Sequence, residues 1–206
     1  MDRTIQDKFS AIEDGDVWGY DHQGRSERTA KMRRQLLTFL DAEDIKSIRD
    51  IPCGHFTWQK TLLEEAELQG LSIDYSGADI VPSIIRSNHD ISDHRFEVMD
   101  ITTDQIPPCD LLMVRDCLVH LTDEQILRAL NNIRRSKAKW IAITNFPTRQ
   151  HRFRNDWDPL NFWRPLNLID PPFNLPFPSW IIVEASDPSG HYADKTLSIW
   201  KLASLT

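Results

Sequence analysis

A glycine turn followed by evenly placed carboxylates is the part of this sequence best suited to chemistry. Residues 50–54 read Asp-Ile-Pro-Cys-Gly, and a turn containing Gly54 lets the backbone approach a ligand closely. Asp79 lies 25 positions beyond Gly54, a spacing that suits a carboxylate bound to the two hydroxyls of a ribose. Asp100 ends the next apolar run, where it can meet an adenine amino group. These residues predict a nucleoside pocket. A dinucleotide site is disfavoured, because only Gly54 of the pattern G-x-G-x-x-G is present.

A candidate general base follows the next apolar run. His120 is the favoured base, because it lies just beyond the fourth predicted strand, at the sheet edge where ligands bind, and Asp116 could orient it or act itself. In the alternative interpretation, His120 only hydrogen-bonds backbone at the start of a helix that Thr122 caps.

Thiol and metal chemistry are disfavoured. Cys53 and Cys117 have no neighbouring triad that would form a thiolate. A zinc site built from Cys53, His55, Cys109 and Cys117 lacks the usual ligand spacing, so we expect no metal. Three cysteines cannot all pair, which favours a reduced, cytoplasmic location.

The elements that must position these residues alternate between strand and helix. This order predicts a parallel α/β sheet covered on both faces, with ligands at the carboxyl ends of the strands. Residues 1 to about 25, with three glycines, read as a loop, and a helix follows from Arg28. The predicted strands are 47–51, 73–78, 95–99, 110–114, 140–144, 180–185 and 195–202, and the predicted helices are 56–66, 82–88 and 122–135.

Size and charge limit the partners. The chain has 206 residues and a formal charge of −7, which suits one domain and argues against binding to nucleic acid. No apolar run is long enough for a membrane span, and the N-terminus is no signal peptide.

A proline-rich stretch between residues 145 and 180 is the least regular part of the chain. Seven of the twelve prolines lie between Pro147 and Pro178, which favours an extended cover for an acceptor substrate. Alternatively, the stretch only closes one end of the sheet. The candidate substrate-binding residues here are Arg149, Trp163, Arg164 and Asn167.

Several motifs, in one order, resemble the class I S-adenosylmethionine-dependent methyltransferases. The branch that the chain looks like has D-x-P-C-G in place of the commoner D-x-G-x-G. The resemblance runs from about Trp18 to the C-terminus. The shared motifs are D-x-P-C-G-x-F-x-W (50–58), G-x-D-I-V-P (77–82), R-D-C-L-V-H-L (115–121), W-R-P-L-N-L (163–168), P-P-F-N-x-P (171–176) and D-K-x-L-x-x-W (194–200), with Asp100 at a strand end.

The resemblance implies a single Rossmann-like domain over residues 1–206, with a seven-stranded, mostly parallel sheet. Its parts would be an N-terminal loop and helix lid (1–40), cofactor-binding units (46–144), an acceptor lid (145–180) and C-terminal strands (181–206). The cofactor would be S-adenosylmethionine, with S-adenosylhomocysteine as product. Its implied binding residues are Arg25, Ser26, Asp50, Pro52, Cys53, Gly54, Trp58, Asp79, Ile80, Asp100, Ile101 and Arg115, with Arg28 as a further candidate for the methionine carboxylate.

The same branch looks like enzymes of glycan or secondary-metabolite pathways, some of them fused to glycosyltransferases. It therefore implies O-methylation of a sugar hydroxyl, in a protein that is a domain of, or works with, a glycosyltransferase. Three alternatives stay open: a small-metabolite methyltransferase, a protein methyltransferase, and an inactive scaffold that keeps the fold.

Overall fold

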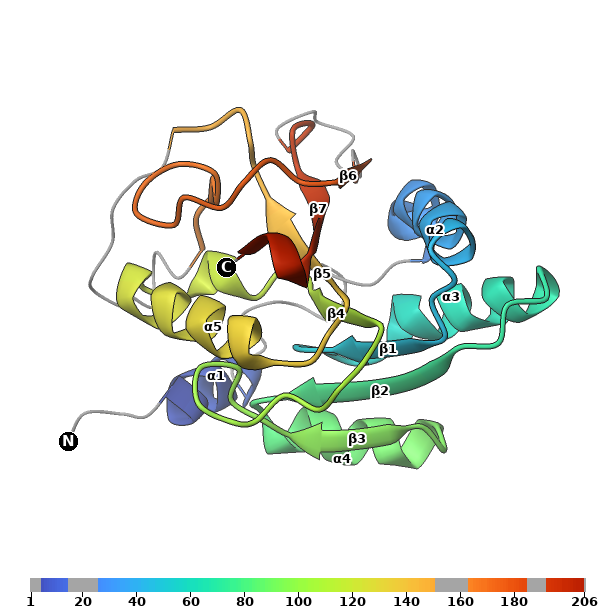
Figure 1. The fold of residues 1–206 in the computed structure, drawn as a ribbon. Helices are drawn as coiled ribbons and strands as arrows, with labels where there is room; N and C mark the ends of the chain where they lie inside the picture. Colours follow the sequence, from blue (N-terminus) through green and yellow to red (C-terminus); the bar gives the residue numbers. More distant parts are fainter. Residues whose placement is uncertain (1–4, 15–25, 151–162, 185–191, 206) are drawn as a thin grey trace.

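The architecture is a seven-stranded sheet with helices on both faces (Figure 1). The computed structural model describes residues 5–14, 26–150, 163–184 and 192–205. The strands are β1 (Ser47–Asp50), β2 (Asp74–Asp79), β3 (Arg95–Val98), β4 (Leu111–Val114), β5 (Trp140–Asn145), β6 (Trp180–Val183) and β7 (Thr196–Lys201). All seven strands predicted from the sequence are confirmed, with shifts of one or two residues at their ends.

The strand order creates a natural binding edge. It runs β3-β2-β1-β4-β5-β7-β6, and among these strands β7 alone runs opposite to the others. The chain moves outward from β1 in one direction through β2 and β3, then returns to β4 on the other side. At such a reversal the loops leave the sheet in opposite directions, so a crevice forms at the carboxyl ends of β1 and β4.

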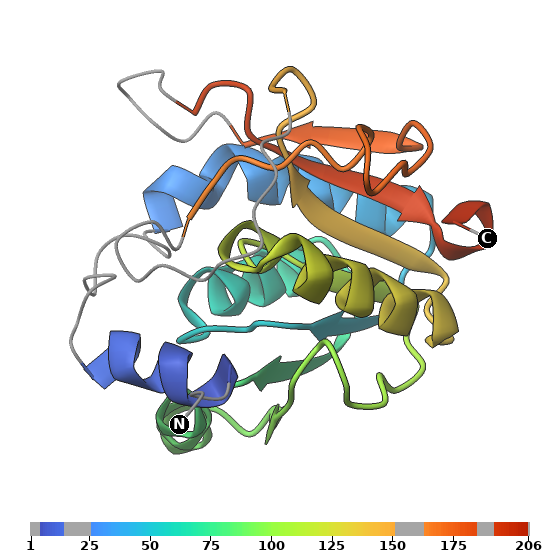
Figure 2. The ribbon, with the colours of Figure 1, turned by 90° about the vertical axis from the view of Figure 1, so that its left-hand side faces the viewer.

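Helices cover both faces of the sheet, because alternate side chains of its central strands are apolar on both faces. Leu112 and Val114 of β4 pack in the cluster with α5, whereas Leu111 and Met113 pack in the cluster with α2 and α3. Figures 1 and 2 show α5 on one face and α2 on the other. The helices are α1 (Ile5–Asp14), α2 (Ser26–Ala42), α3 (Thr57–Leu68), α4 (Pro82–Ile91) and α5 (Asp123–Arg135), with short 3₁₀ helices at Leu118–His120 and Leu202–Leu205.

The helix predicted over 122–135 is confirmed together with its cap. Thr122 Oγ1 accepts the Gln125 backbone N–H, and Gln125 Oε1 accepts the Thr122 N–H. This reciprocal pair satisfies two backbone donors that the first turn would leave open. It therefore fixes the point at which the chain leaves the His120 turn and enters α5.

The prediction of a loop at the N-terminus was wrong for residues 5–14, which form α1. Ile5, Phe9 and Ile12 recur at spacings of four and three, which is the period of a helix face. Phe9 and Ile12 are buried on that face, in the same cluster as α5. The three glycines that favoured a loop all follow this helix.

The described part of the proline-rich stretch, residues 163–180, packs into the core. Leu166, Leu168, Phe173 and Leu175 are almost fully buried. The backbone of this part is also fixed, because the Phe146 N–H donates to the Leu166 carbonyl and the Leu175 N–H to the Leu168 carbonyl. This supports the interpretation in which the stretch closes one end of the sheet. Residues 151–162 lie outside the described residues, so the lid stays a prediction there.

Candidate active site

A cavity of about 340 Å³ opens at the carboxyl ends of the first four strands. We call it the pocket. Its walls come from the loops after β1, β2, β3 and β4, together with α1 and the start of α3. Of the predicted site residues, those lining it are Pro52, Cys53, Gly54, Trp58, Asp79, Ile80, Asp100, Ile101, Arg115, Asp116 and His120. Eleven of the predicted site residues therefore lie around one pocket, and their roles stay predictions.

Asp50 ends β1 and lies beneath the lining with no exposed surface. Its Oδ2 accepts hydrogen bonds from Gln59 Nε2 at 2.8 Å and from the Tyr75 hydroxyl at 3.0 Å. Its Oδ1 has no hydrogen-bond partner. Burial raises the pKa of Asp50 to about 7, although the two neutral donors oppose the shift.

The turn after β1 is shaped by its one glycine. Gly54 has a φ of +53°, a backbone conformation that glycine adopts without a Cβ penalty. Its N–H donates to Asp79 Oδ2 at 3.2 Å, and its carbonyl accepts from Asn88 Nδ2 at 2.7 Å. The turn is therefore tied to β2 and α4 on both sides. A Cβ on Gly77 of β2 would lie 2.8 Å from the Cβ of Cys53, so this strand needs glycine there.

Asp79 and Asp100 reach the pocket from the ends of β2 and β3. Both Asp79 oxygens accept backbone amides, Oδ1 from Val81 at 3.0 Å and Oδ2 from Gly54. Burial raises the pKa of Asp79 to about 6, and these amides limit the rise. Asp100 Oδ1 accepts the N–H and hydroxyl of Thr102. Asp100 thus closes its own turn as well as lining the pocket.

Trp58 and Arg115 form the wall nearest to β4. Trp58 is buried at the start of α3, and the guanidinium of Arg115 lies 5.4 Å from the centroid of its ring. A cation over an indole face is a favourable contact that holds both side chains in place. Trp58 is therefore part of the pocket wall.

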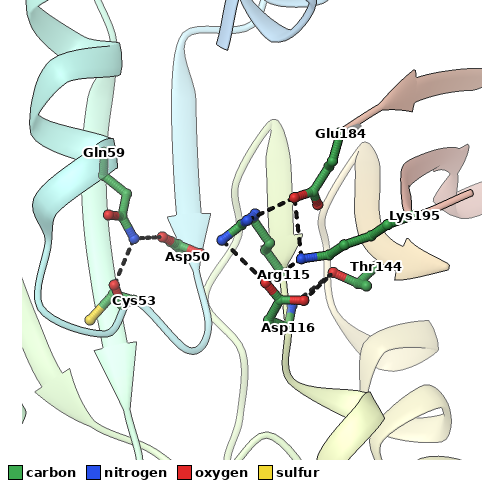
Figure 3. Close-up of polar contacts among 8 residues, drawn as sticks. All are labelled: Asp50, Cys53, Gln59, Arg115, Asp116, Thr144, Glu184 and Lys195. Atoms are coloured by element: carbon green, nitrogen blue, oxygen red, sulfur yellow. Dashed lines mark hydrogen bonds and ion pairs between the residues drawn. The ribbon is translucent and has the colours of Figure 1, made fainter. Parts of the chain in front are cut away.

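Arg115 also belongs to an ion-pair network with Asp116, Glu184 and Lys195 (Figure 3). Arg115 contacts Glu184 at 2.7 Å and Asp116 at 3.3 Å, and Lys195 Nζ contacts Asp116 at 2.7 Å and Glu184 at 3.2 Å. Each cation therefore bridges both carboxylates. The network joins the end of β4 to the chain beside β6 and β7.

The network makes Asp116 a poor proton acceptor. Burial alone would raise the pKa of Asp116, but Lys195 and Arg115 lower it well below its usual value. Asp116 has a φ of +53°, and its backbone N–H donates to Thr144 Oγ1 at 2.8 Å. The alternative in which Asp116 itself acts as the base is thus disfavoured, and its geometry suits a fixed negative charge.

His120 ends the 3₁₀ turn that follows Asp116. Its N–H donates to the Cys117 carbonyl at 3.0 Å, its side chain is buried, and its ring stands edge-on to Phe9 of α1. A protonated His120 also lowers the pKa of Asp116, after the effects of Lys195 and Arg115. An imidazole at the pocket wall beside a fixed anion can accept a proton and hold the resulting charge.

Comparisons with known proteins find a similar fold in solved structures but no similar sequence. No model of a known protein family and no curated protein matches the sequence. The crystal structure of magnesium protoporphyrin IX methyltransferase (ChlM) from Synechocystis PCC 6803 with bound S-adenosylmethionine has a TM-score of 0.51 at 13% identity, with 73% of this chain and 78% of that chain covered. The chain has the fold of a class I methyltransferase.

Two further solved structures are similar over smaller shares of their length. The PH0226 protein from Pyrococcus horikoshii OT3 has a TM-score of 0.49 at 16% identity, and the match covers 58% of this chain and 57% of that chain. Human N-acetylserotonin methyltransferase in complex with S-adenosylmethionine has a TM-score of 0.49 at 17% identity, and the match covers 70% of this chain and 42% of that chain.

The predicted substrate-binding residues are Arg149, Trp163, Arg164 and Asn167. None of the four lines the pocket as far as the structure describes it. Arg164 is buried in an ion pair with Asp123, and Arg149 contacts Asp194 through two nitrogens at 2.7 and 2.8 Å. Both arginines are therefore paired with carboxylates of the chain, and a role for either in substrate binding stays a prediction.

Asn167 and Trp163 also have partners within the chain. Asn167 Oδ1 accepts the Ile169 N–H, and its Nδ2 donates to the Pro147 carbonyl. The Trp163 ring packs edge-on against Phe146 and Tyr192. Both side chains thus stabilise the described part of the proline-rich stretch.

The predicted contacts to the methionine carboxylate are only partly visible. Arg25 lies outside the described residues, and Ser26 begins α2 without a described side chain. Arg28 is exposed and does not line the pocket.

Helix α1 forms a wall of the pocket that the sequence did not predict. Its residues Ile5, Phe9 and Glu13 line the pocket. Gln6 Nε2 donates to the Ile80 carbonyl at 3.0 Å, and Glu13 lies 2.9 Å from His55 Nε2. The helical spacing of its apolar residues was the available signal.

The cysteines are not activated. Burial raises the pKa of Cys109 to about 11 and that of Cys53 well above its usual value. Within residues 5–14, 26–150, 163–184 and 192–205, no group of three or more His, Cys, Asp or Glu side chains could hold a metal ion. In the same ranges, no helix combines the length and the apolar character that a bilayer crossing requires.

Proposed function

We propose that this protein is an S-adenosylmethionine-dependent methyltransferase. The observation that carries the proposal is the pocket at the reversal of the strand order, with Asp79 and Asp100 at the ends of adjacent strands. That arrangement fits the ribose and adenine of one nucleoside. The magnesium protoporphyrin IX methyltransferase structure, with a TM-score of 0.51, holds S-adenosylmethionine, which supports the proposal.

The residues of the chain fit the donor along the whole pocket. Asp79 would accept the ribose hydroxyls, and Ile80 and Ile101 would enclose the adenine beside Asp100. The methionine end would lie toward Gly54, Trp58 and Arg115, where the Arg115 carbonyl is a further acceptor. When bound, the cofactor supplies an activated methyl group, so the protein need mainly align donor and acceptor and exclude water.

His120 would remove the proton of a hydroxyl acceptor. A neutral hydroxyl is a poor nucleophile, so a base that takes its proton speeds transfer by about 10²–10⁴-fold. As His120 becomes an imidazolium, the anionic Asp116 beside it would stabilise the new charge. Asp116 therefore acts in this proposal as an electrostatic partner of His120.

The acceptor that we propose is the hydroxyl of a sugar, such as a deoxysugar at the end of a glycan. The support is the resemblance of the motifs to the glycan-modifying branch, and it is independent of the pocket geometry. The neighbours with this fold include a protoporphyrin and an N-acetylserotonin methyltransferase, so the fold alone does not select an acceptor.

Two measurements test the proposal in sequence. Thermal shift with S-adenosylhomocysteine tests the pocket, and a stabilised protein is expected because a ligand that binds only the folded state raises the melting temperature. Release of S-adenosylhomocysteine is then measured with panels of sugars, small metabolites and peptides. Turnover on sugars supports the full proposal, turnover on another panel overturns the sugar acceptor, and binding without any turnover favours a scaffold. If S-adenosylhomocysteine does not bind, the proposal that the protein is a methyltransferase is wrong.

A further inference from the structure

Two charged residues from the end of the β6–β7 pair hold Asp116 in the pocket wall. Glu184 directly follows β6 and Lys195 directly precedes β7, and the Glu184 N–H donates to the Lys195 carbonyl at 3.0 Å. Figure 3 shows both side chains reaching toward the end of β4. In the part of the chain that the structure describes, neither residue lines the pocket, whereas Arg115 and Asp116 do. Glu184 and Lys195 can therefore act on the pocket only through these two residues.

The four charges of the ion-pair network balance. Lys195 Nζ is the nearer cation of Asp116, at 2.7 Å from Oδ2, compared with 3.3 Å for Arg115 Nη1. The same Lys195 nitrogen lies 3.2 Å from Glu184 Oε2. Loss of Lys195 would leave the network with one excess negative charge, and loss of Glu184 would leave it with one excess positive charge.

Stability alone does not explain these charges. The four side chains are between 1% and 17% exposed. Glu184 Oε1 and Arg115 Nε have no hydrogen-bond partner among the described residues. Buried ion pairs can often be replaced by apolar residues without loss of stability, and an incompletely satisfied network is less favourable still. An effect on the chemistry of the pocket explains them better.

Asp116 passes the charge of the network on to His120. Burial raises the pKa of Asp116, whereas Lys195 and then Arg115 lower it below its usual value. A protonated His120 acts on Asp116 in the same direction, so the Asp116 anion in turn favours the protonated form of His120. The other titratable or charged residues that share the pocket with His120 are Glu13, Cys53, His55, Asp79, Asp100, Arg115 and Cys117.

We propose that Lys195 and Glu184 are positioning residues of methyl transfer, which hold Asp116 in place and set the pH at which His120 can accept a proton. The inference rests on the proposed function, in which His120 is the base. Lys195 offsets the charge of Asp116, so that His120 is not kept in the protonated form, which cannot act as a base. Glu184 limits the effect of the two cations, so that Asp116 still stabilises the imidazolium formed during transfer.

The two residues should move the titration of His120 in opposite directions. Lys195→Met removes a positive charge, which favours the imidazolium and raises the midpoint. Glu184→Gln removes a negative charge and lowers the midpoint. A charge within about 4–6 Å changes a pKa by about 1–3, and these charges act from one residue further away, so we expect movements of about 0.5 to 1 pH unit. The double variant Lys195→Met/Glu184→Gln should return close to the wild-type midpoint.

NMR titration of the His120 imidazole measures this midpoint without any acceptor. The signal is identified by its loss in His120→Ala, and the titrations are made with and without S-adenosylhomocysteine. Lys201→Met is the matched control, because it removes the same charge from the opposite end of β7, where Lys201 lies over the ring of Trp140. Both this control and Lys195→Arg, which keeps the charge, should titrate like the wild type.

Opposite movements in the two single variants, with recovery in the double variant, support the proposal. Reduced stability with an unchanged midpoint in both would show that the network is only structural and would overturn it, and so would movements in the same direction. If Lys195→Met does not fold, an unchanged midpoint in Glu184→Gln is sufficient to reject the proposal. Failure of S-adenosylhomocysteine to bind the wild type, which the same spectra show separately, would instead overturn the proposed function.

Discussion

The two halves of the site differ in how they are built. The half that we propose for the donor comes from the ends of β1, β2 and β3, where backbone amides and carboxylates meet in short turns, as at Gly54 and Asp79. The half that we propose for the acceptor comes from the Asp116–His120 turn, where Lys195, from a distant part of the chain, contacts Asp116 and joins it to Glu184. Local turns fix the first half, and long-range ion pairs fix the second.

This difference decides what a substitution does. In the donor half, a changed side chain should weaken binding of the cofactor. In the acceptor half, a change should either slow methyl transfer or destabilise the fold, according to whether the side chain lines the pocket or supports it. The following variants separate these cases.

His120→Ala should have the largest effect on turnover. We expect a loss of about 10²–10⁴-fold in rate, because the general base is removed, with little change in the affinity for S-adenosylhomocysteine. Rates are measured with an acceptor from the panel and affinities by calorimetry. His89→Ala, an exposed histidine of α4 outside the pocket, is the matched control. Equal losses of rate and affinity would remove His120 from the role of base.

Arg164→Ala should destabilise the protein instead of changing substrate affinity. It leaves the buried carboxylate of Asp123 without its cation, which typically costs about 3–5 kcal/mol of unfolding free energy. Denaturant unfolding measures the change. If the variant had normal stability and a raised KM for the acceptor, Arg164 would instead bind the substrate.

Asp79→Asn should weaken the binding of S-adenosylhomocysteine by about tenfold to a hundredfold, because the amide replaces a charged group that accepts hydrogen bonds from the ribose hydroxyls. Calorimetry compares it with Asp74→Asn, which changes the same residue type at the exposed start of the same strand. Unchanged affinity in Asp79→Asn would show that its carboxylate serves only the amides of Gly54 and Val81.

Arg149→Ala should have the smallest effect. Its partner Asp194 and the arginine itself are both partly exposed, and such ion pairs contribute about 0–1 kcal/mol. Unfolding free energy and KM should both stay close to the wild-type values. A large rise in KM would place the acceptor beside Phe146, over which Arg149 lies.

The same contrast explains how far the sequence could be read. The meeting of Gly54 and Asp79 at one pocket was predictable, because strand ends and a glycine turn leave local patterns in the sequence. The ion-pair network was not, since Glu184 and Lys195 are distant from Asp116 in the sequence and only the sheet order brings them together.

Two features of the structure were not predicted, for different physical reasons. The ion pairs of Arg149 and Arg164 join residues that are distant in the sequence, and such pairing leaves no pattern in the sequence. Helix α1 was overlooked although Ile5, Phe9 and Ile12 have helical spacing, because the glycines after it dominated the interpretation.

The central claim is that the pocket binds the nucleoside of a methyl donor through Asp79. Calorimetric titration of S-adenosylhomocysteine into the wild-type protein and Asp79→Asn tests it most directly. We expect saturable binding of one ligand per chain, with micromolar affinity in the wild type and clearly weaker binding in the variant. The absence of saturable binding to the wild-type protein would contradict it.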